Sequence, residues 1–436
     1  MENNAIQSKT DTSVRQANDL LFASLFLEMN KVLKTKQSLN SRPELGRKIS
    51  EVLSRMMTEE MPRFKDSKTP EEVKEAAVER INEWKKAIGQ PSIEQYAALS
   101  KYWGIPFSDV VNDKVTPSMI YDLLDCFVVG QEDYKRQLAT SFFSYLLKND
   151  ERSGLLELPK SNLCVYGPSG SGKTFGFQTL ARHYGIPIII VRCNTLVPEG
   201  IRGISISDYF TKAYRSIKLS DKEKKKAELR KAIVCFDEFD KIFENEYYSE
   251  SICNEILSCI DDDGEICFSE KPDHEGEKIT LSNKNMMFVF TGVFQGLDKI
   301  RSGNCLGFRN GEKSGEALKR IDSKDLVKFG IKSEIAGRIQ NCAEVKPLSV
   351  NDLYDLLNSN LESPFDTFRN YFRLNDIEAV ITDDAKMMLA QMAYDRELGV
   401  RGIKGLLNTI LREDMHHLNV GEKLEINCEY IEQHIN

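Results

Sequence analysis

The residues from 167 to 174 constrain this chain most, because they spell the pattern G-x-x-x-x-G-K-T. Glycines let a backbone wrap tightly and turn its N–H groups toward phosphate oxygens. A lysine and a hydroxyl residue after the last glycine suit the β- and γ-phosphates and a bound Mg²⁺. The pattern therefore predicts an ATP site at Gly167, Ser169, Gly170, Ser171, Gly172, Lys173 and Thr174.

The residues on either side of this loop fit a strand and a helix. Residues 163–166 form a short apolar run, and residues 175–184 have helical character. A helix that starts at such a loop directs its N-terminus at the phosphates. Further apolar runs at 186–191, 233–236 and 286–290 alternate with helical segments. This alternation predicts an α/β domain around a parallel sheet that is covered on both faces.

Two carboxylates complete the predicted site. The apolar run at 233–236 ends in Asp237 and Glu238. At the carboxyl edge of a sheet, we expect Asp237 to hold Mg²⁺ through water and Glu238 to polarise the attacking water. The acid pair favours hydrolysis of ATP over phosphoryl transfer to a substrate, because a kinase must keep water out.

Composition narrows the class of protein. The 436 residues carry a net charge of −8, without the basic excess of a general nucleic-acid binder. No apolar run has the length of a membrane helix, and residues 1–16 are polar, so neither a membrane protein nor a signal peptide is expected. The 10 cysteines include no C-x-x-C pair, which argues against zinc. We expect a cytoplasmic protein.

Changes in the expected secondary structure along the chain predict three domains. Residues 1–112 are expected to form a helical N-terminal domain, residues 113–345 the nucleotide-binding domain, and residues 346–436 a smaller, mainly helical domain. Residues 93–111 faintly resemble half of a helix-turn-helix. The segment at 108–113, which would have to contact DNA, contains two aspartates and would repel phosphates. An ordinary helical bundle is the favoured interpretation, and nucleic acid is not an expected partner.

From about residue 116 onward, a series of segments resembles ClpX, the AAA+ unfoldase family of the Clp protease. The resemblance covers about three-quarters of the chain, and its segments follow one another in family order. They are DCFVVGQ at 125–131, DEFDKI at 237–242, FTG at 290–292, GLDKI at 296–300, DLVKFG at 325–330, EIAGR at 334–338 and GVRGI at 399–403.

The resemblance implies roles for further residues. Val128 and Val129 would line the adenine pocket, and Thr291 would end the first sensor strand. Arg338 would be an arginine finger that reaches the nucleotide of a neighbouring subunit, and Arg401 a second sensor within its own subunit. A finger supplied in trans implies a homo-hexameric ring.

The chain departs from the family at the axial pore. The family's aromatic pore loop is replaced by GIRG at 200–203, so Ile201 and Arg202 would make a weaker grip on a protein substrate. Tyr247 and Tyr248 either compensate as a second pore loop or cap a surface loop. An acidic segment at 270–278 replaces the family's basic entrance, and no cysteine precedes Cys126, so the family's N-terminal zinc module is not expected.

One further tripeptide suggests a partner. Leu306, Gly307 and Phe308 lie in a polar loop, at the position where ClpX-type unfoldases dock on their peptidase. The favoured hypothesis is an ATP-dependent unfoldase that delivers protein substrates to a ClpP-type peptidase. A stand-alone remodelling factor, or an ATP-switched module that binds a partner or DNA, are the alternatives.

Overall fold

The computed structural model describes residues 93, 96–97, 100, 106–111, 115–150, 158–199, 201, 203–244, 247–272, 276–303, 320–359, 362–417 and 423–435. They divide between two compact units. The larger unit contains Val115–Leu124 and Gly130–Pro347. The smaller unit contains Asp125–Val129 and Leu348–Asn436, together with residues before Val115. The predicted division into domains 1–112, 113–345 and 346–436 stays a prediction.

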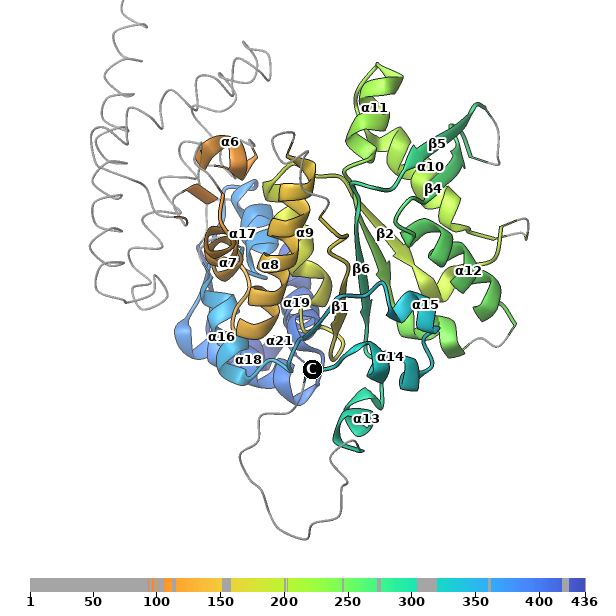
Figure 1. Ribbon diagram of the computed structural model, residues 1–436. Coiled ribbons are helices and arrows are strands. Elements are labelled where there is room, and N and C mark those ends of the chain that lie inside the picture. The colour runs from red at the N-terminus through yellow and green to blue at the C-terminus, as the bar shows by residue number, and fades with distance from the viewer. Residues whose placement is uncertain are drawn as a thin grey trace, which may run out of the picture. The chain divides into compact units, whose positions relative to one another are not determined.

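The larger unit is built on a five-stranded parallel sheet (Figure 1), which confirms the predicted fold class. In chain order, the strands are β1 (Leu163–Tyr166), β2 (Ile188–Arg192), β3 (Ile233–Asp237), β6 (Met287–Gly292) and β7 (Asn341–Glu344). Their order in the sheet is β2-β3-β6-β1-β7. β1 therefore lies between β6 and β7, and the loop that follows it opens where the strand order changes direction. Open α/β sheets bind ligands at such a point.

Helices connect and cover these strands. α8 (Glu132–Asn149) packs on β1 and β7, and α10 (Ile206–Ser216) packs on β2. The other helical elements of this unit are α7 (Pro117–Asp125), α9 (Lys173–His183), η3 (Cys193–Thr195), α11 (Lys222–Leu229), η4 (Phe239–Glu244), α12 (Ser249–Ile260), α13 (Leu297–Gly303), α14 (Ser323–Phe329) and α15 (Ser333–Ala336). Among the described helices, none combines the length and apolar character needed to cross a bilayer.

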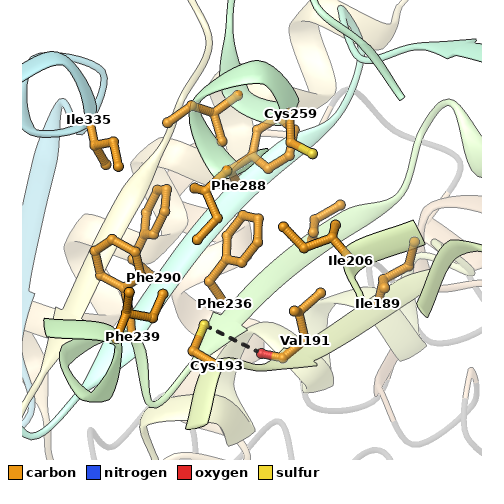
Figure 2. Packing of buried hydrophobic residues seen from close by; sticks show 14 of the residues in the cluster. Ile189, Val191, Cys193, Ile206, Phe236, Phe239, Cys259, Phe288, Phe290 and Ile335 are labelled. Carbon is orange, nitrogen blue, oxygen red and sulfur yellow. Dashed lines mark hydrogen bonds between the residues drawn. The ribbon is translucent and has the colours of Figure 1, made fainter. Parts of the chain in front are cut away.

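Aromatic side chains fill the core on one face of the sheet. The ring of Phe236 on β3 stacks on those of Phe290 and Phe288 on β6, with centroid separations of 5.4 and 6.4 Å. Figure 2 shows how Phe239 and Val191 extend this cluster along the neighbouring elements. All these side chains are buried, and each phenylalanine contributes about 1.5–3 kcal/mol of transfer free energy. The packing holds the carboxyl ends of β3 and β6 in a fixed relation.

An antiparallel hairpin was not predicted from the sequence. β4 (Glu265–Ser269) pairs with β5 (Lys278–Ser282), and the acidic entrance segment forms the connection between them. Lys222 forms ion pairs with Glu270 and Glu277 at 3.1 and 3.2 Å, which offset part of the acidic charge. Inward-facing Phe268 and Ile279 are buried, so the hairpin is anchored to the core.

The smaller unit is mainly helical, as predicted, but it also contains two strands. β8 (Glu378–Ile381) pairs in parallel with β9 (Lys423–Ile426). Each strand has only four residues, which is the shortest run over which the alternation of buried and exposed side chains can be recognised. The helices are α6 (Phe107–Val111), α16 (Val350–Asn358), α17 (Asp366–Arg373), α18 (Asp383–Asp395), α19 (Gly399–Ile410), α20 (Arg412–His416) and α21 (Cys428–His434).

Candidate functional site

The predicted phosphate-binding loop joins β1 to α9 in a tightly curled conformation. Gly167, Gly170 and Gly172 have φ angles of 149°, 74° and 93°, in the region that favours glycine. A Cβ atom on Gly167 would lie 2.0 Å from the carbonyl oxygen of Val345, so only glycine fits there. The Gly167 N–H donates to the carbonyl of Gly292 at 3.3 Å, which links the loop to the end of β6.

The lysine of this loop lies in its concavity. The Nζ of Lys173 donates to the carbonyl oxygens of Gly167 and Pro168, each at 2.7 Å. The Ser171 hydroxyl also donates to the Pro168 carbonyl, at 2.7 Å. The ammonium group is thus held where phosphate oxygens would bind, above the first turn of α9, whose partial positive charge favours anions. The loop residues fit the triphosphate of a nucleotide.

A tyrosine that the sequence analysis overlooked supports this loop from α8. The Tyr134 hydroxyl donates to the carbonyl of Lys173 at 2.8 Å, and its side chain is buried. A Cβ atom on Gly176 would lie 2.5 Å from that hydroxyl oxygen, so the ring occupies the space that the missing side chain leaves. Burial raises the pKa of Tyr134 well above its ordinary value, which keeps the hydroxyl protonated as a donor.

The two predicted carboxylates lie at the carboxyl ends of the strands. Asp237 ends β3, and its Oδ1 accepts a 2.5 Å hydrogen bond from the hydroxyl of Thr291 on β6. Thr291 is fully buried, so the structure places it as an orienting partner of Asp237. Glu238 follows with an exposed side chain and a φ of 55°, which is uncommon for a residue other than glycine. Such backbone strain is often found at functional sites.

Asp240 is a second residue whose role was missed. It lies in η4, is 6% exposed, and accepts a 2.9 Å hydrogen bond from the backbone N–H of Phe294. A Cβ atom on Gly292 would approach its Oδ1 to 2.5 Å. Asp240 therefore ties the segment after Glu238 to the turn that follows β6. The sequence offered only its place in the acidic segment after β3.

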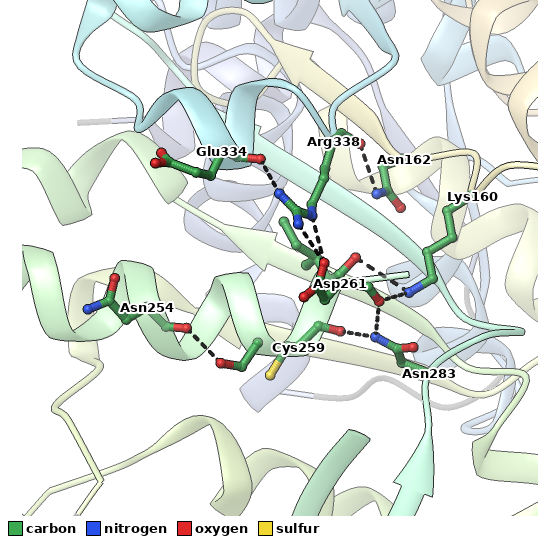
Figure 3. Close-up of polar contacts among 10 residues, drawn as sticks. Lys160, Asn162, Asn254, Cys259, Asp261, Asn283, Glu334 and Arg338 are labelled. Atoms are coloured by element: carbon green, nitrogen blue, oxygen red, sulfur yellow. Dashed lines mark hydrogen bonds and ion pairs between the residues drawn. The ribbon is translucent and has the colours of Figure 1, made fainter. Parts of the chain in front are cut away.

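Arg338 lies at the amino-terminal ends of the strands, opposite the phosphate-binding loop. It comes just before β7, whose first residue, Asn341, is in register with Leu163, the first residue of β1. Its Nε and Nη2 donate to Oδ1 of Asp261 at 3.2 and 2.5 Å, and its Nη1 donates to the carbonyl of Glu334 at 2.8 Å (Figure 3). Hydrogen bonding to Arg338 lowers the pKa of Asp261.

The remaining predicted residues are distributed over both units. Ile201 is 44% exposed and Tyr247 is 92% exposed in the larger unit. In the smaller unit, Val128 is buried and Arg401 is exposed on α19, whereas Val129 is half-buried. Arg202 and the tripeptide at 306–308 lie outside the described residues.

The residues available for a metal ion are few. The described residues contain no cluster of three or more His, Cys, Asp and Glu side chains that could bind one. Thr174 near the start of α9 and Asp237 at the end of β3 supply two oxygen donors at the carboxyl edge of the sheet. Such a sparse set suits Mg²⁺, which keeps several waters and takes its other ligands from phosphates.

Comparisons with known proteins agree with this geometry. Residues 163–295 match the AAA family, the ATPase family associated with various cellular activities. The chain is 27% identical over 352 residues to the ATP-dependent Clp protease ATP-binding subunit ClpX of Porphyromonas gingivalis ATCC 33277, covering 74% of this chain and 83% of that protein. The ClpX of strain W83 matches to the same extent.

Proposed function

Because the chain is an ATP-hydrolysing AAA+ protein of ClpX type, we propose that it uses ATP hydrolysis to unfold or remodel protein substrates as a homo-hexameric ring. Gly167–Gly172 would bind the phosphates through backbone N–H groups, and Lys173 would exchange its loop carbonyls for phosphate oxygens. Thr174 and Asp237 would hold Mg²⁺, which would neutralise phosphate charge during hydrolysis. Val128 and Val129 would contact the adenine, and Arg401 the phosphates.

The water-activating group in this proposal is Glu238. Its left-handed backbone turns the chain sharply at the end of β3, and the N–H of Lys241 bonds to its carbonyl at 3.0 Å. Glu238 thus follows the carboxyl end of β3, and the phosphate loop follows the carboxyl end of the parallel strand β1. There the Glu238 carboxylate would accept a proton from the attacking water.

The observation that carries the proposed ring is the position of Arg338. The phosphate loop follows the carboxyl end of β1, whereas Arg338 precedes the amino end of its neighbour β7. The four residues of β1 separate these edges by about 13 Å. The guanidinium group is also turned toward Asp261 at the amino edge. Arg338 is thus poorly placed for the nucleotide of its own chain and suitable for that of a neighbour, as the hexamer requires.

Contact with substrate is proposed for Ile201 and Tyr247, whose side chains are exposed, and for Arg202. Ile201 and Arg202 would grip an extended polypeptide, and Tyr247 would add an aromatic contact. The exposed ring of Tyr247 precedes α12, the helix whose other end carries Asp261. Because an isoleucine offers less area than a tyrosine, the grip of Ile201 would be weak, and Arg202 would favour acidic segments.

We further propose that the protein delivers its unfolded substrates to a ClpP-type peptidase. This proposal rests on Leu306, Gly307 and Phe308, an apolar tripeptide within a polar stretch of sequence. An apolar anchor repeated around a ring can bind a partner ring through many weak contacts. Unfolding activity that is unchanged by a peptidase, with no association between the two, would instead identify a stand-alone remodelling factor.

The proposal can be tested by mixing two inactive variants. Arg338→Ala removes the finger and Glu238→Gln removes the base, and each alone should lower ATPase activity at least tenfold while nucleotide still binds. In mixed rings, some interfaces pair an intact base with an intact finger, so activity should recover. Lys173→Ala subunits should lose nucleotide binding itself, and mixing them with Glu238→Gln is the control that restores nothing, because neither variant then has a working site of its own.

Co-purification of differently tagged subunits verifies that mixed rings form. The absence of recovery in verified mixed rings would contradict the shared site. Full activity of Arg338→Ala alone would remove the finger from the mechanism. Loss of a fluorescent substrate's native signal, dependent on ATP and on Glu238, measures the proposed unfolding directly.

A further inference from the structure

A group of buried polar side chains gathers at the amino edge of the sheet, away from the nucleotide loop. Lys160 and Asn162 precede β1 and are each 2% exposed, and Asn283, between β5 and β6, is fully buried. Burying such groups costs free energy unless they form hydrogen bonds. The described contacts of these side chains converge on the carboxyl end of α12 and on Arg338 (Figure 3). Asn162 also bonds to the start of β6.

Two of these side chains fix the backbone of Asp261. The Nζ of Lys160 donates to the carbonyl of Asp261 and, at 3.4 Å, to that of Ile260. The amide Nδ2 of Asn283 donates to the carbonyl of Asp261 at 2.7 Å and to that of Cys259 at 2.6 Å. The last carbonyls of a helix need such donors, and a cation complements its partial negative charge. Asp261 therefore stands on a rigid helix end.

The third side chain fixes the backbone of Arg338. The Nδ2 of Asn162 donates to the Arg338 carbonyl at 2.9 Å, and its Oδ1 accepts from the N–H of Phe288 on β6 at 3.4 Å. The Arg338 N–H donates to the carbonyl of Ile335 in α15 at 3.0 Å. Both members of the Arg338–Asp261 pair thus have backbones tied to the sheet.

The guanidinium group itself is oriented by the same scaffold. Asp261 accepts two of its N–H bonds and the Glu334 carbonyl accepts a third, while the Arg338 side chain remains 32% exposed. We propose that Asp261, supported by Lys160, Asn162 and Asn283, is a positioning residue that presents Arg338 to the nucleotide of the neighbouring subunit. The inference rests on the proposed trans role of Arg338 and assigns the residues that make it effective.

The decisive variant is Asp261→Asn, which keeps the size of the side chain and removes its charge. Steady-state ATPase activity should fall at least fivefold, whereas the affinity for a fluorescent ATP analogue and the melting temperature should stay within the error of the native protein. Asp261→Glu, which retains the carboxylate, should recover part of the activity. Asp262→Asn, an adjacent exposed acid, is the matched control and should leave ATPase activity unchanged.

Subunit mixing separates positioning from general structural damage. An Asp261→Asn subunit keeps its own base, so it should regain activity beside a Glu238→Gln subunit, whose Arg338 and Asp261 are intact. A defect that mixing does not restore would overturn the inference, because the damage would then lie within the variant's own site. Unchanged or increased activity of Asp261→Asn alone would also overturn it. Full activity of Arg338→Ala would instead reject the trans finger.

Discussion

The hydroxyl of Tyr134 on α8 donates a 2.8 Å hydrogen bond to the carbonyl of Lys173, the first residue of α9. This bond crosses from one helix to the residue whose ammonium group occupies the phosphate loop. Gly176 makes the approach possible, because any Cβ there would clash with the tyrosine ring. The pair fixes the first turn of α9 and, through it, the position of Lys173.

Tyr134→Phe should weaken ATP binding about fivefold, corresponding to about 1 kcal/mol for one neutral hydrogen bond. The remaining ring still fills the space beside Gly176, so the fold should persist. Isothermal titration with a slowly hydrolysed ATP analogue measures the effect. Tyr145→Phe is the matched control, since Tyr145 also lies on α8 and donates to a backbone carbonyl, that of Lys231, away from the loop. Equal affinity losses in both variants would contradict a specific role for Tyr134.

Thr291→Val should raise the Mg²⁺ concentration needed for half-maximal ATPase activity several-fold. Valine keeps the shape of threonine but removes the hydroxyl that donates to Asp237, so the carboxylate loses its fixed orientation. A titration of activity against Mg²⁺ at saturating ATP tests this. Thr280→Val, at an exposed position of β5, controls for the substitution itself. An unchanged Mg²⁺ requirement would show that Asp237 is oriented without Thr291.

Because Lys160 is buried, we expect its contribution to the free energy of unfolding to depend on pH. Burial lowers its pKa to about 8, from 10.5 in the unfolded chain. Below pH 8 both states are protonated, and the cost of burying the charge is fully present. Between pH 8 and 10.5 the unfolded chain holds a proton that the folded chain has lost, so the Lys160 contribution to stability rises with pH.

Denaturant unfolding of the native chain and of Lys160→Met tests this sign. The difference in unfolding free energy between them should change by on the order of 1–3 kcal/mol across that pH window, in favour of the native chain at high pH. Taking a difference removes the contributions of tyrosines and cysteines that titrate in the same range. Lys278→Met, at an exposed position, should show no such trend relative to the native chain. A flat difference for Lys160→Met would contradict the lowered pKa.

Ile201→Tyr should increase the number of stable domains unfolded per ATP consumed, without a matching rise in ATPase activity in the absence of substrate. An aromatic ring buries more area against a moving chain, and such contacts are worth on the order of 1–3 kcal/mol each. The measurement is the unfolding rate per ATP consumed for one stable domain that carries either an acidic or a neutral tail. Leu219→Tyr, at another exposed apolar position, is the control. If Ile201→Tyr changes nothing, Tyr247 becomes the better candidate for the grip.

The conformation of the phosphate-binding loop was predictable from sequence because its backbone requirements are local. A glycine loop between a strand and a helix requires adjacent residues with special backbone angles, and the observed φ angles of Gly167, Gly170 and Gly172 meet this requirement. Apolar strands bounded by polar residues likewise identified the parallel sheet, which the structure confirms. The acid pair was recognisable because Asp237 ends one of these strands and Glu238 directly follows it.

Relations between distant residues were decided only by the tertiary structure. Tyr134 and Gly176 come into contact only because α8 packs beside α9. Asp261 and Arg338 form an ion pair because α12 and the segment before β7 end at the same end of the sheet. Neither pair has a sequence pattern, since each side chain is ordinary for its position and only packing brings the partners together. The sequence by itself thus determined that this chain binds and hydrolyses ATP. The tertiary structure decided that Arg338 lies at the opposite end of the strands from the phosphate loop. β1 and β7 are parallel neighbours in the sheet, so the residues before β7 and the loop after β1 lie at opposite ends.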